Sequence, residues 1–196
     1  MKPIVGLPAI YVTVCLIAGC SLWPNQPPLA QVHDFGLLPA ADHNEGLNVR
    51  VDAVMAPTWL SSDAIHYRLL YNDATALRQY ADHRWAAPPS DLLAARLGYL
   101  LPPQPVGDGG MHKVYLLSAN LLEFEQDFSG ARDAYVRLVL EISLRRAGDG
   151  LIIAQHRFVM TQPATPDVQG AINGLAQLAN EAAAAAVAWA QTQVQE

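Results

Sequence analysis

The sequence predicts an α/β (α+β) fold, a mainly antiparallel sheet with a C-terminal three-strand meander packed against two helices. Three observations support this prediction: polar and apolar residues alternate along several segments, a Gly-Asp-Gly turn joins two of them, and two proline-led segments have helical spacing. Hydrophobic residues make up 52% of the 196 residues and charged residues 15%. This is enough apolar material for a sizeable core, so wholesale disorder is excluded.

Strand-like alternation defines the expected sheet. Val136 and every second residue as far as Leu144 are apolar, while most residues between them are polar. The turn at 148–150 tolerates positive φ, so residues 113–161 are expected to form an antiparallel meander. The alternation changes face near Asn120, which predicts a bulge or bend. The candidate strands are residues 31–37, 47–54, 64–71, 113–128, 134–144 and 151–161.

Two helices are expected, at residues 89–101 and 166–192. Pro88 and Pro89 preset φ for the first turn of the first helix. In the second helix we predict Thr165 as the N-cap, followed by an alanine-rich apolar stripe that allows close approach to a sheet. The stripe consists of Val168, Ile172, Leu175, Ala179, Ala182, Ala186 and Trp189.

The first twenty residues resemble a bacterial lipoprotein signal. Lys2 supplies a positive charge, and the uncharged apolar stretch that follows is shorter than the roughly 20 residues of a membrane span. Leu16–Cys20 then resembles a lipobox, in which the cysteine becomes the lipidated first residue. We therefore predict lipidation of Cys20; the alternative is an ordinary secretory signal with a chance cysteine.

This signal divides the chain into three parts. Residues 1–19 are expected to be the signal peptide, residues 20–30 the lipidated N-terminus and a proline-containing tether, and residues 31–196 a single α/β domain. In the usual proteobacterial sorting logic, serine after the lipidated cysteine favours the outer membrane, and Ser21 occupies this position. We therefore expect a lipid-anchored protein of the outer membrane that faces the periplasm.

Motifs for common catalytic and binding chemistry are missing from the sequence. It contains no P-loop motif and no short zinc motif. A formal net charge of -6 argues against nucleic-acid binding through phosphate neutralisation. Apart from the covalent lipid on Cys20, we expect no cofactor and no metal, and we assign no catalytic residue.

Polar residues within two expected strands are candidate sites. Glu123, Glu125 and Asp127 alternate on one strand face, where they could form paired acids or a cation site, but a solvated strand face is the favoured interpretation. His156 shares a strand face with apolar residues, and we expect it to be hydrogen-bonded and partly buried.

Trp85, next to Arg84, is either a binding hot spot or a core residue beneath the first helix.

Several motifs in the first half of the chain carry a family resemblance. Tyr67–Tyr71 form an aromatic strand, Leu77–Tyr80 read Leu-x-x-Tyr, Arg84–Pro89 read Arg-Trp-Ala-Ala-Pro-Pro, and Leu92–Leu97 form a leucine-bearing segment ending in Arg-Leu. With the overall order of elements, they resemble the ABC-type transport auxiliary lipoprotein family, the PqiC-like lipoproteins, over essentially the whole mature chain. The chain departs from this family at residues 72–75, where members often have proline.

The resemblance implies a non-enzymatic outer-membrane lipoprotein in an ABC/MCE-type system that moves lipids or other hydrophobic molecules between membranes. It implies a periplasmic MCE-domain partner, and it leaves homo-oligomerisation open. The two alternatives are a stand-alone structural or assembly lipoprotein of the envelope and an enzyme such as a hydrolase. The candidate partner-binding or turn-shaping residues, expected around the start of the first helix, are Tyr67, Tyr80, Arg84, Trp85, Pro88 and Pro89.

Overall fold

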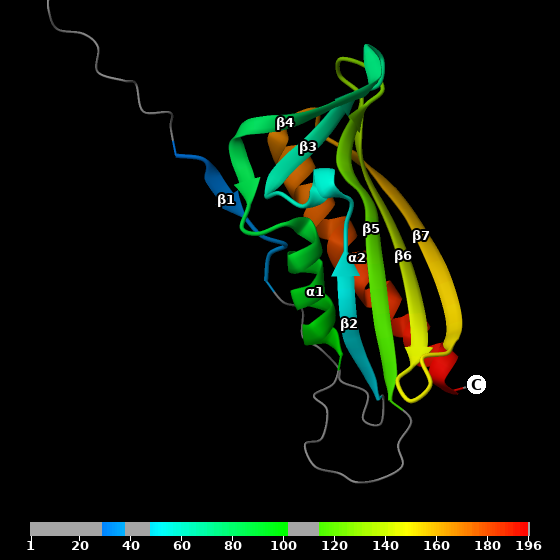
Figure 1. Cartoon of the computed structure of the whole chain (residues 1–196). Helices are drawn as coiled ribbons and strands as arrows, with labels where there is room; N and C mark the ends of the chain where they lie inside the picture. Colours follow the sequence, from blue (N-terminus) through cyan, green and yellow to red (C-terminus); the bar gives the residue numbers. More distant parts are fainter. Residues whose placement is uncertain (1–28, 38–47, 102–113, 196) are drawn as a thin grey trace, which may run out of the picture.

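A curved, mixed sheet with two helices against one of its faces forms the body of the molecule (Figure 1). The computed structural model describes residues 29–37, 48–101 and 114–195. The helices are α1 (Pro89–Leu100) and α2 (Val168–Gln195), and a short 3-10 helix, η2, spans Thr58–Leu60. The strands are β1 (Gln31–His33), β2 (Val49–Met55), β3 (Ala64–Leu69), β4 (Asp73–Trp85), β5 (Tyr115–Phe128), β6 (Ala134–Arg146) and β7 (Ile152–Ala164).

Strand β5 organises the sheet. The strand order is β1-β4-β3-β5-β6-β7, and β2 also pairs with β5. On one edge β5 pairs with β6 in antiparallel fashion along almost its whole length. On its other edge the first half of β5 pairs with β2 and the second half with β3, both in parallel fashion. The sheet is therefore mixed, and its antiparallel character is concentrated in the predicted C-terminal meander.

The meander β5-β6-β7 is confirmed, and its packing follows from the sequence pattern. The alternating apolar residues of β6, from Val136 to Leu144, are at most 2% exposed. They share one buried core with residues of α2, which packs on β6 and β7 (Figure 1). Gly150 has a φ of 72° in the β6–β7 turn, as the Gly-Asp-Gly signal predicts. A register shift in β5 between Leu121 and Glu123 confirms the predicted bulge.

Helix α2 approaches the sheet closely. At Gly174, an added Cβ would lie 2.7 Å from a methyl group of Val136, so any larger residue would overlap β6. The alanines of the predicted stripe are buried at the same interface. The predicted N-cap is wrong: Asp167 caps the helix, because its Oδ1 accepts a 2.7 Å hydrogen bond from the backbone N–H of Gly170. Thr165 instead donates its hydroxyl to Asp167.

Strand β4 is the main element that the sequence pattern misses. Its neighbours in the sheet are β3 and the three-residue β1, so much of it is exposed and its residues lack a clear alternation. The first strand is shorter than the expected residues 31–37, because only Gln31–His33 pair with β4. Phe35 leaves the sheet and enters the core instead.

The helix-facing side of the sheet carries the core, and the opposite side is open. We call these the inner face and the outer face.

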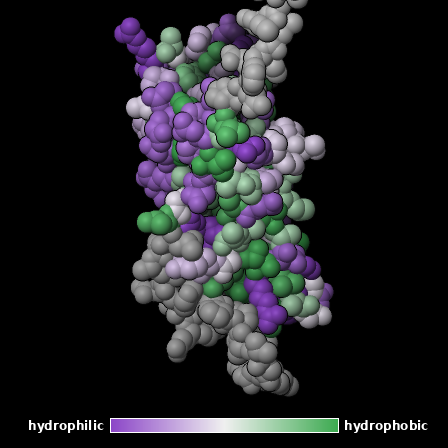
Figure 2. All heavy atoms as spheres, turned by 90° about the vertical axis from the view of Figure 1, so that its left-hand side faces the viewer, coloured by the Kyte–Doolittle hydropathy of each residue, from purple (hydrophilic) through white to green (hydrophobic). Residues whose placement is uncertain are grey.

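On the side of the molecule with β1 and α1, hydrophobic residues reach the surface near its middle, whereas hydrophilic residues gather toward the upper left (Figure 2). Within the described residues, neither helix has the length and apolarity that crossing a bilayer requires.

Candidate functional site

A polar site of the outer face lies where β5 changes partners. Met55 of β2 pairs with Asn120, and the next parallel pair joins His66 of β3 to Glu125. Between these points, no described strand pairs with residues 121–124 on that edge, and η2 bridges the gap. The bulge of β5 falls in the same interval. A partner change and a bulge together open a cleft in an otherwise continuous sheet.

We call this feature the branch cleft. Its volume is about 440 Å³. The apolar part of its lining comes from η2, from the end of β3 and from the bulge of β5, and the charged part from β3, β5 and β6. The lining residues are Pro57, Trp59, Leu60, Arg68, Leu70, Leu122, Glu123, Phe124, Glu125, Asp127 and Arg137.

Two ion pairs occupy the charged part of the branch cleft. The Nε of Arg68 donates to Oε1 of Glu125 at 2.7 Å, and Arg137 donates to Glu123. Arg68 also donates to the backbone carbonyls of Ala74 and Thr75. Both arginines are therefore already held by carboxylates. Burial raises the pKa of Glu125 above its ordinary value, although Arg68 acts against this shift.

Asp127 is the carboxylate without a cationic partner in the cleft. It is only 4% exposed, and its Oδ1 has no hydrogen-bond partner in the described part of the chain. Burial, helped by the negative charge of Glu125, raises the pKa of Asp127 to about 6. Near neutral pH the cleft thus holds three carboxylates and two guanidinium groups, an excess of one negative charge.

The expected solvated face is therefore wrong for Glu125 and Asp127, whereas the side chain of Glu123 is 40% exposed. The alternation itself is correct, but β3 lies alongside this half of β5, and Glu125 and Asp127 are buried there. A signal was present in the sequence, because Arg68 and Arg137 stand at outward positions of strands that flank β5. Only the strand order reveals that these arginines meet the acids.

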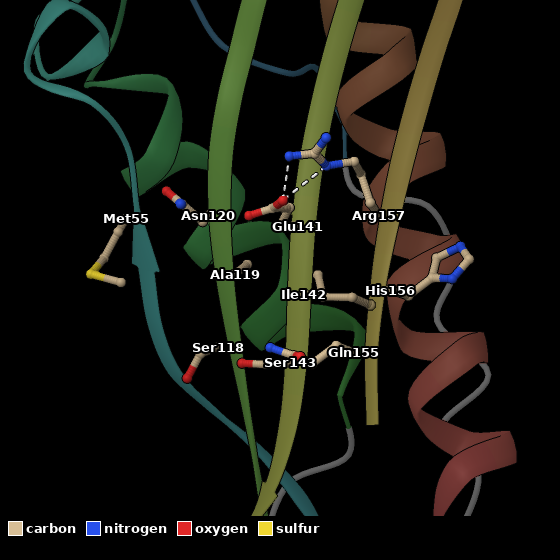
Figure 3. Close-up of a pocket in the computed structure, with 10 residues that line it drawn as sticks. All are labelled: Met55, Ser118, Ala119, Asn120, Glu141, Ile142, Ser143, Gln155, His156 and Arg157. Atoms are coloured by element: carbon tan, nitrogen blue, oxygen red, sulfur yellow. Dashed lines mark hydrogen bonds and ion pairs between the residues drawn. The ribbon is translucent and has the colours of Figure 1, made fainter. Parts of the chain in front are cut away.

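A second, shallower hollow lies lower on the outer face, across β5, β6 and β7 (Figure 3). Its volume is about 370 Å³. Its one charged pair is self-contained, since both Nε and a terminal nitrogen of Arg157 donate to Oε1 of Glu141. His156 points away from this pair, toward α2, where its ring stacks on Trp189. Contrary to expectation, His156 is exposed and makes ring contacts.

The residues of the family resemblance fall into two separate groups. The rings of Tyr67 and Tyr80 lie in tilted contact, with centroids 4.7 Å apart. The hydroxyl of Tyr80 donates to Gln126 at 2.6 Å, and Gln126 donates to the carbonyl of Thr165 just before α2. Burial raises the pKa of Tyr80 to about 12. This group links β3, β4, β5 and the start of α2, so the expectation that it lies at the start of the first helix is wrong.

The second group does surround the start of α1. Trp85 is 1% exposed and its ring lies 5.5 Å from that of Phe35, so it is a core residue. Pro88 precedes the helix and Pro89 is its first residue. Arg84 is exposed, with its guanidinium 3.8 Å from the carboxylate of Asp63. Trp85 and the prolines thus shape the turn, and Arg84 is the member of this group that a partner can reach. Cys20 and Ser21 lie outside the described residues.

The donor sets present in the structure limit what the site can hold. Among residues 29–37, 48–101 and 114–195, no three His, Cys, Asp or Glu side chains are grouped so that they could hold a metal ion. The branch cleft instead combines carboxylates, already paired guanidinium groups and an exposed indole. This arrangement suits recognition of a charged organic group.

The sequence matches the model of a known family, described as ABC-type transport auxiliary lipoprotein component, over residues 38–187. The chain belongs to this family. No curated protein matches it. Its fold is similar to that of a Xanthomonas campestris protein assigned to family DUF330, with a TM-score of 0.66 and 18% identity over 84% of this chain and 97% of that one. An uncharacterized protein of known structure has a TM-score of 0.58 and 17% identity, over 80% and 95% of the two chains.

Proposed function

We propose that this auxiliary lipoprotein resides in the outer membrane and docks the periplasmic MCE-domain component of an ABC-type system that transports lipids or other hydrophobic molecules. The observation that carries the proposal is the family match over residues 38–187. An auxiliary component assists a machine whose energy comes from elsewhere, and the absence of a P-loop motif in the sequence agrees with such a role. We propose no catalytic function.

The anchor is the first part of this proposal. The lipobox resemblance predicts acylation of Cys20, and Ser21 favours export to the outer membrane. Several acyl chains would hold the protein firmly, whereas a single chain binds only reversibly. Incorporation of labelled palmitate should be lost in Cys20→Ala. In a sucrose gradient the wild type should accompany outer-membrane markers, and its location wholly with inner-membrane markers would reject this placement.

Docking is the second part. The outer face of the sheet is left uncovered by α1 and α2, and it carries both the branch cleft and the shallower hollow (Figure 1). A large open face of this kind suits a partner that the anchored protein must hold. Co-purification from detergent-solubilised envelopes after crosslinking in cells should recover an MCE-domain protein. If none accompanies the wild type, a stand-alone structural role for the lipoprotein becomes the better explanation.

A further inference from the structure

The branch cleft has the composition of a site for a cation, although it contains two arginines. Arg68 and Arg137 are each bound to a glutamate, so neither is left to receive an anion. The Oδ1 of Asp127 has no partner among the described residues, and the residue is almost fully buried. A buried carboxylate oxygen without a partner is costly, and a cationic group would offset that cost. The missing partner is therefore a positive group.

The lining beside the acids indicates what the cation is attached to. Trp59 of η2 is 55% exposed at the cleft, and Leu70 and Leu122 add apolar surface. A guanidinium group is planar and weakly hydrated, so it can stack on an indole while it donates to a carboxylate. The aliphatic stem of an arginine can lie along the leucines. Arginine fits this combination better than a compact, strongly hydrated ammonium group.

We infer that the branch cleft binds an arginine side chain of a protein partner, between Asp127 and Trp59. This inference rests on the proposed docking function and specifies where and by what chemistry the partner is held. The raised pKa of Asp127 agrees with it, because the carboxylate is desolvated before the partner arrives. The strand pattern offered Asp127 as part of a possible cation site but favoured a solvated face, and it did not point to Trp59.

A titration tests the cleft directly. The full lipidated chain, in a maltoside detergent and with ¹⁵N-labelled tryptophan, contains four tryptophans, and Trp59→Phe identifies the Trp59 indole signal. The peptide acetyl-Gly-Arg-Gly-amide should shift this signal saturably. The same peptide with citrulline, a neutral analogue of arginine, should leave it unchanged. Equal shifts with both peptides, or none with arginine, would overturn the inference.

Matched variants locate the interaction. Asp127→Asn keeps the side-chain shape and should weaken binding of the arginine peptide at least tenfold. Glu141→Gln removes a carboxylate from the shallower hollow of the same face and should change binding less than twofold. Equal weakening by both variants would mean that only the general negative charge matters. Vesicles containing phosphatidylethanolamine provide another arm: a Trp59 shift with vesicles but not with the arginine peptide would assign the cleft to a lipid headgroup.

Co-purification in cells separates failure of the inference from failure of the proposed function. If the MCE-domain protein accompanies the wild type and Glu141→Gln but not Asp127→Asn, both stand. Its retention by Asp127→Asn would overturn the cleft inference and leave docking intact. If the MCE-domain protein does not accompany the wild type, docking to that protein is rejected. The arginine could then not be assigned to that protein.

Discussion

The two faces of the sheet use the alternating residues of the same strands in opposite ways. On the inner face, side chains such as Leu138, Leu140 and Val136 are fully buried against α2, whose small residues allow close contact. On the outer face, the same strands carry charges, and within the branch cleft two of them, Glu125 and Asp127, are buried. Strand periodicity therefore identifies the face that packs against the helices. The segments next to a strand decide whether its other face is exposed to solvent.

The largest effect should come from the inner-face core. Trp85→Ala removes an indole packed against Phe35 and Phe124 and should lower the free energy of unfolding by about 3–5 kcal/mol. Arg84→Ala, one residue earlier, removes an exposed side chain and should cost less than about 1 kcal/mol. Urea denaturation of both variants measures the difference. A similar small loss for the two would mean that Trp85 is not a core residue.

On the outer face, removal of Arg68 should have the next largest effect. Arg68→Ala leaves the buried carboxylate of Glu125 without its cation and should cost about 2–3 kcal/mol near pH 8. Burial already raises the pKa of Glu125, so at pH 5 more of the carboxyl is protonated and the loss should be smaller. The double variant Arg68→Ala/Glu125→Gln should recover part of the stability. An equal loss at both pH values would indicate lost packing instead of lost charge pairing.

Close packing of the inner face can be tested at a glycine. Gly174→Ala places a methyl group 2.7 Å from a methyl of Val136 and should destabilise the protein by about 2 kcal/mol, despite the better helix propensity of alanine. Gly98 in α1 is the matched control, because an added Cβ there meets nothing within 4 Å. Gly98→Ala should stabilise by about 0.4–1 kcal/mol. Thermal unfolding midpoints that move in the same direction for both would contradict this picture.

The sequence was sufficient for the features that depend on local pattern. The inner-facing residues of β6, the turn at Gly150, the bulge of β5 and the proline start of α1 were all predicted, because each depends on neighbouring residues. Strand β4 and the burial of Asp127 were missed, because both depend on strand pairings between segments far apart in the chain. The family resemblance indicated the class of protein, but its tyrosines proved to belong to a separate internal network.

The last prediction concerns the pH dependence of stability on the outer face, and it isolates Asp127. The folded-state pKa of this carboxyl is raised to about 6, above its value in the unfolded chain, so the unfolded state releases the proton first. The destabilisation of the folded state by Asp127 therefore grows as pH rises from about 4 through 6. Above that range it reaches its full value. Allowing for solvent screening at the cleft, we expect Asp127→Asn to stabilise the protein by about 1–2 kcal/mol at pH 7.5 and by much less at pH 4.5.

Because several charged groups surround Asp127, the quantity to measure is the difference in unfolding free energy between the wild type and Asp127→Asn. Glu123, Glu125, Arg68 and Arg137 all act on its charge, and Tyr135 lies opposite it on β6. These neighbours are present in both the wild type and the variant, so their own contributions to stability largely cancel in the difference. Glu141→Gln, on the exposed part of the same face, should show almost no such pH-dependent gain. If Asp127→Asn differs from the wild type by the same amount at both pH values, the pKa of Asp127 is the same in the folded and unfolded chain, and the contrast between the solvated hollow and the desolvated cleft fails.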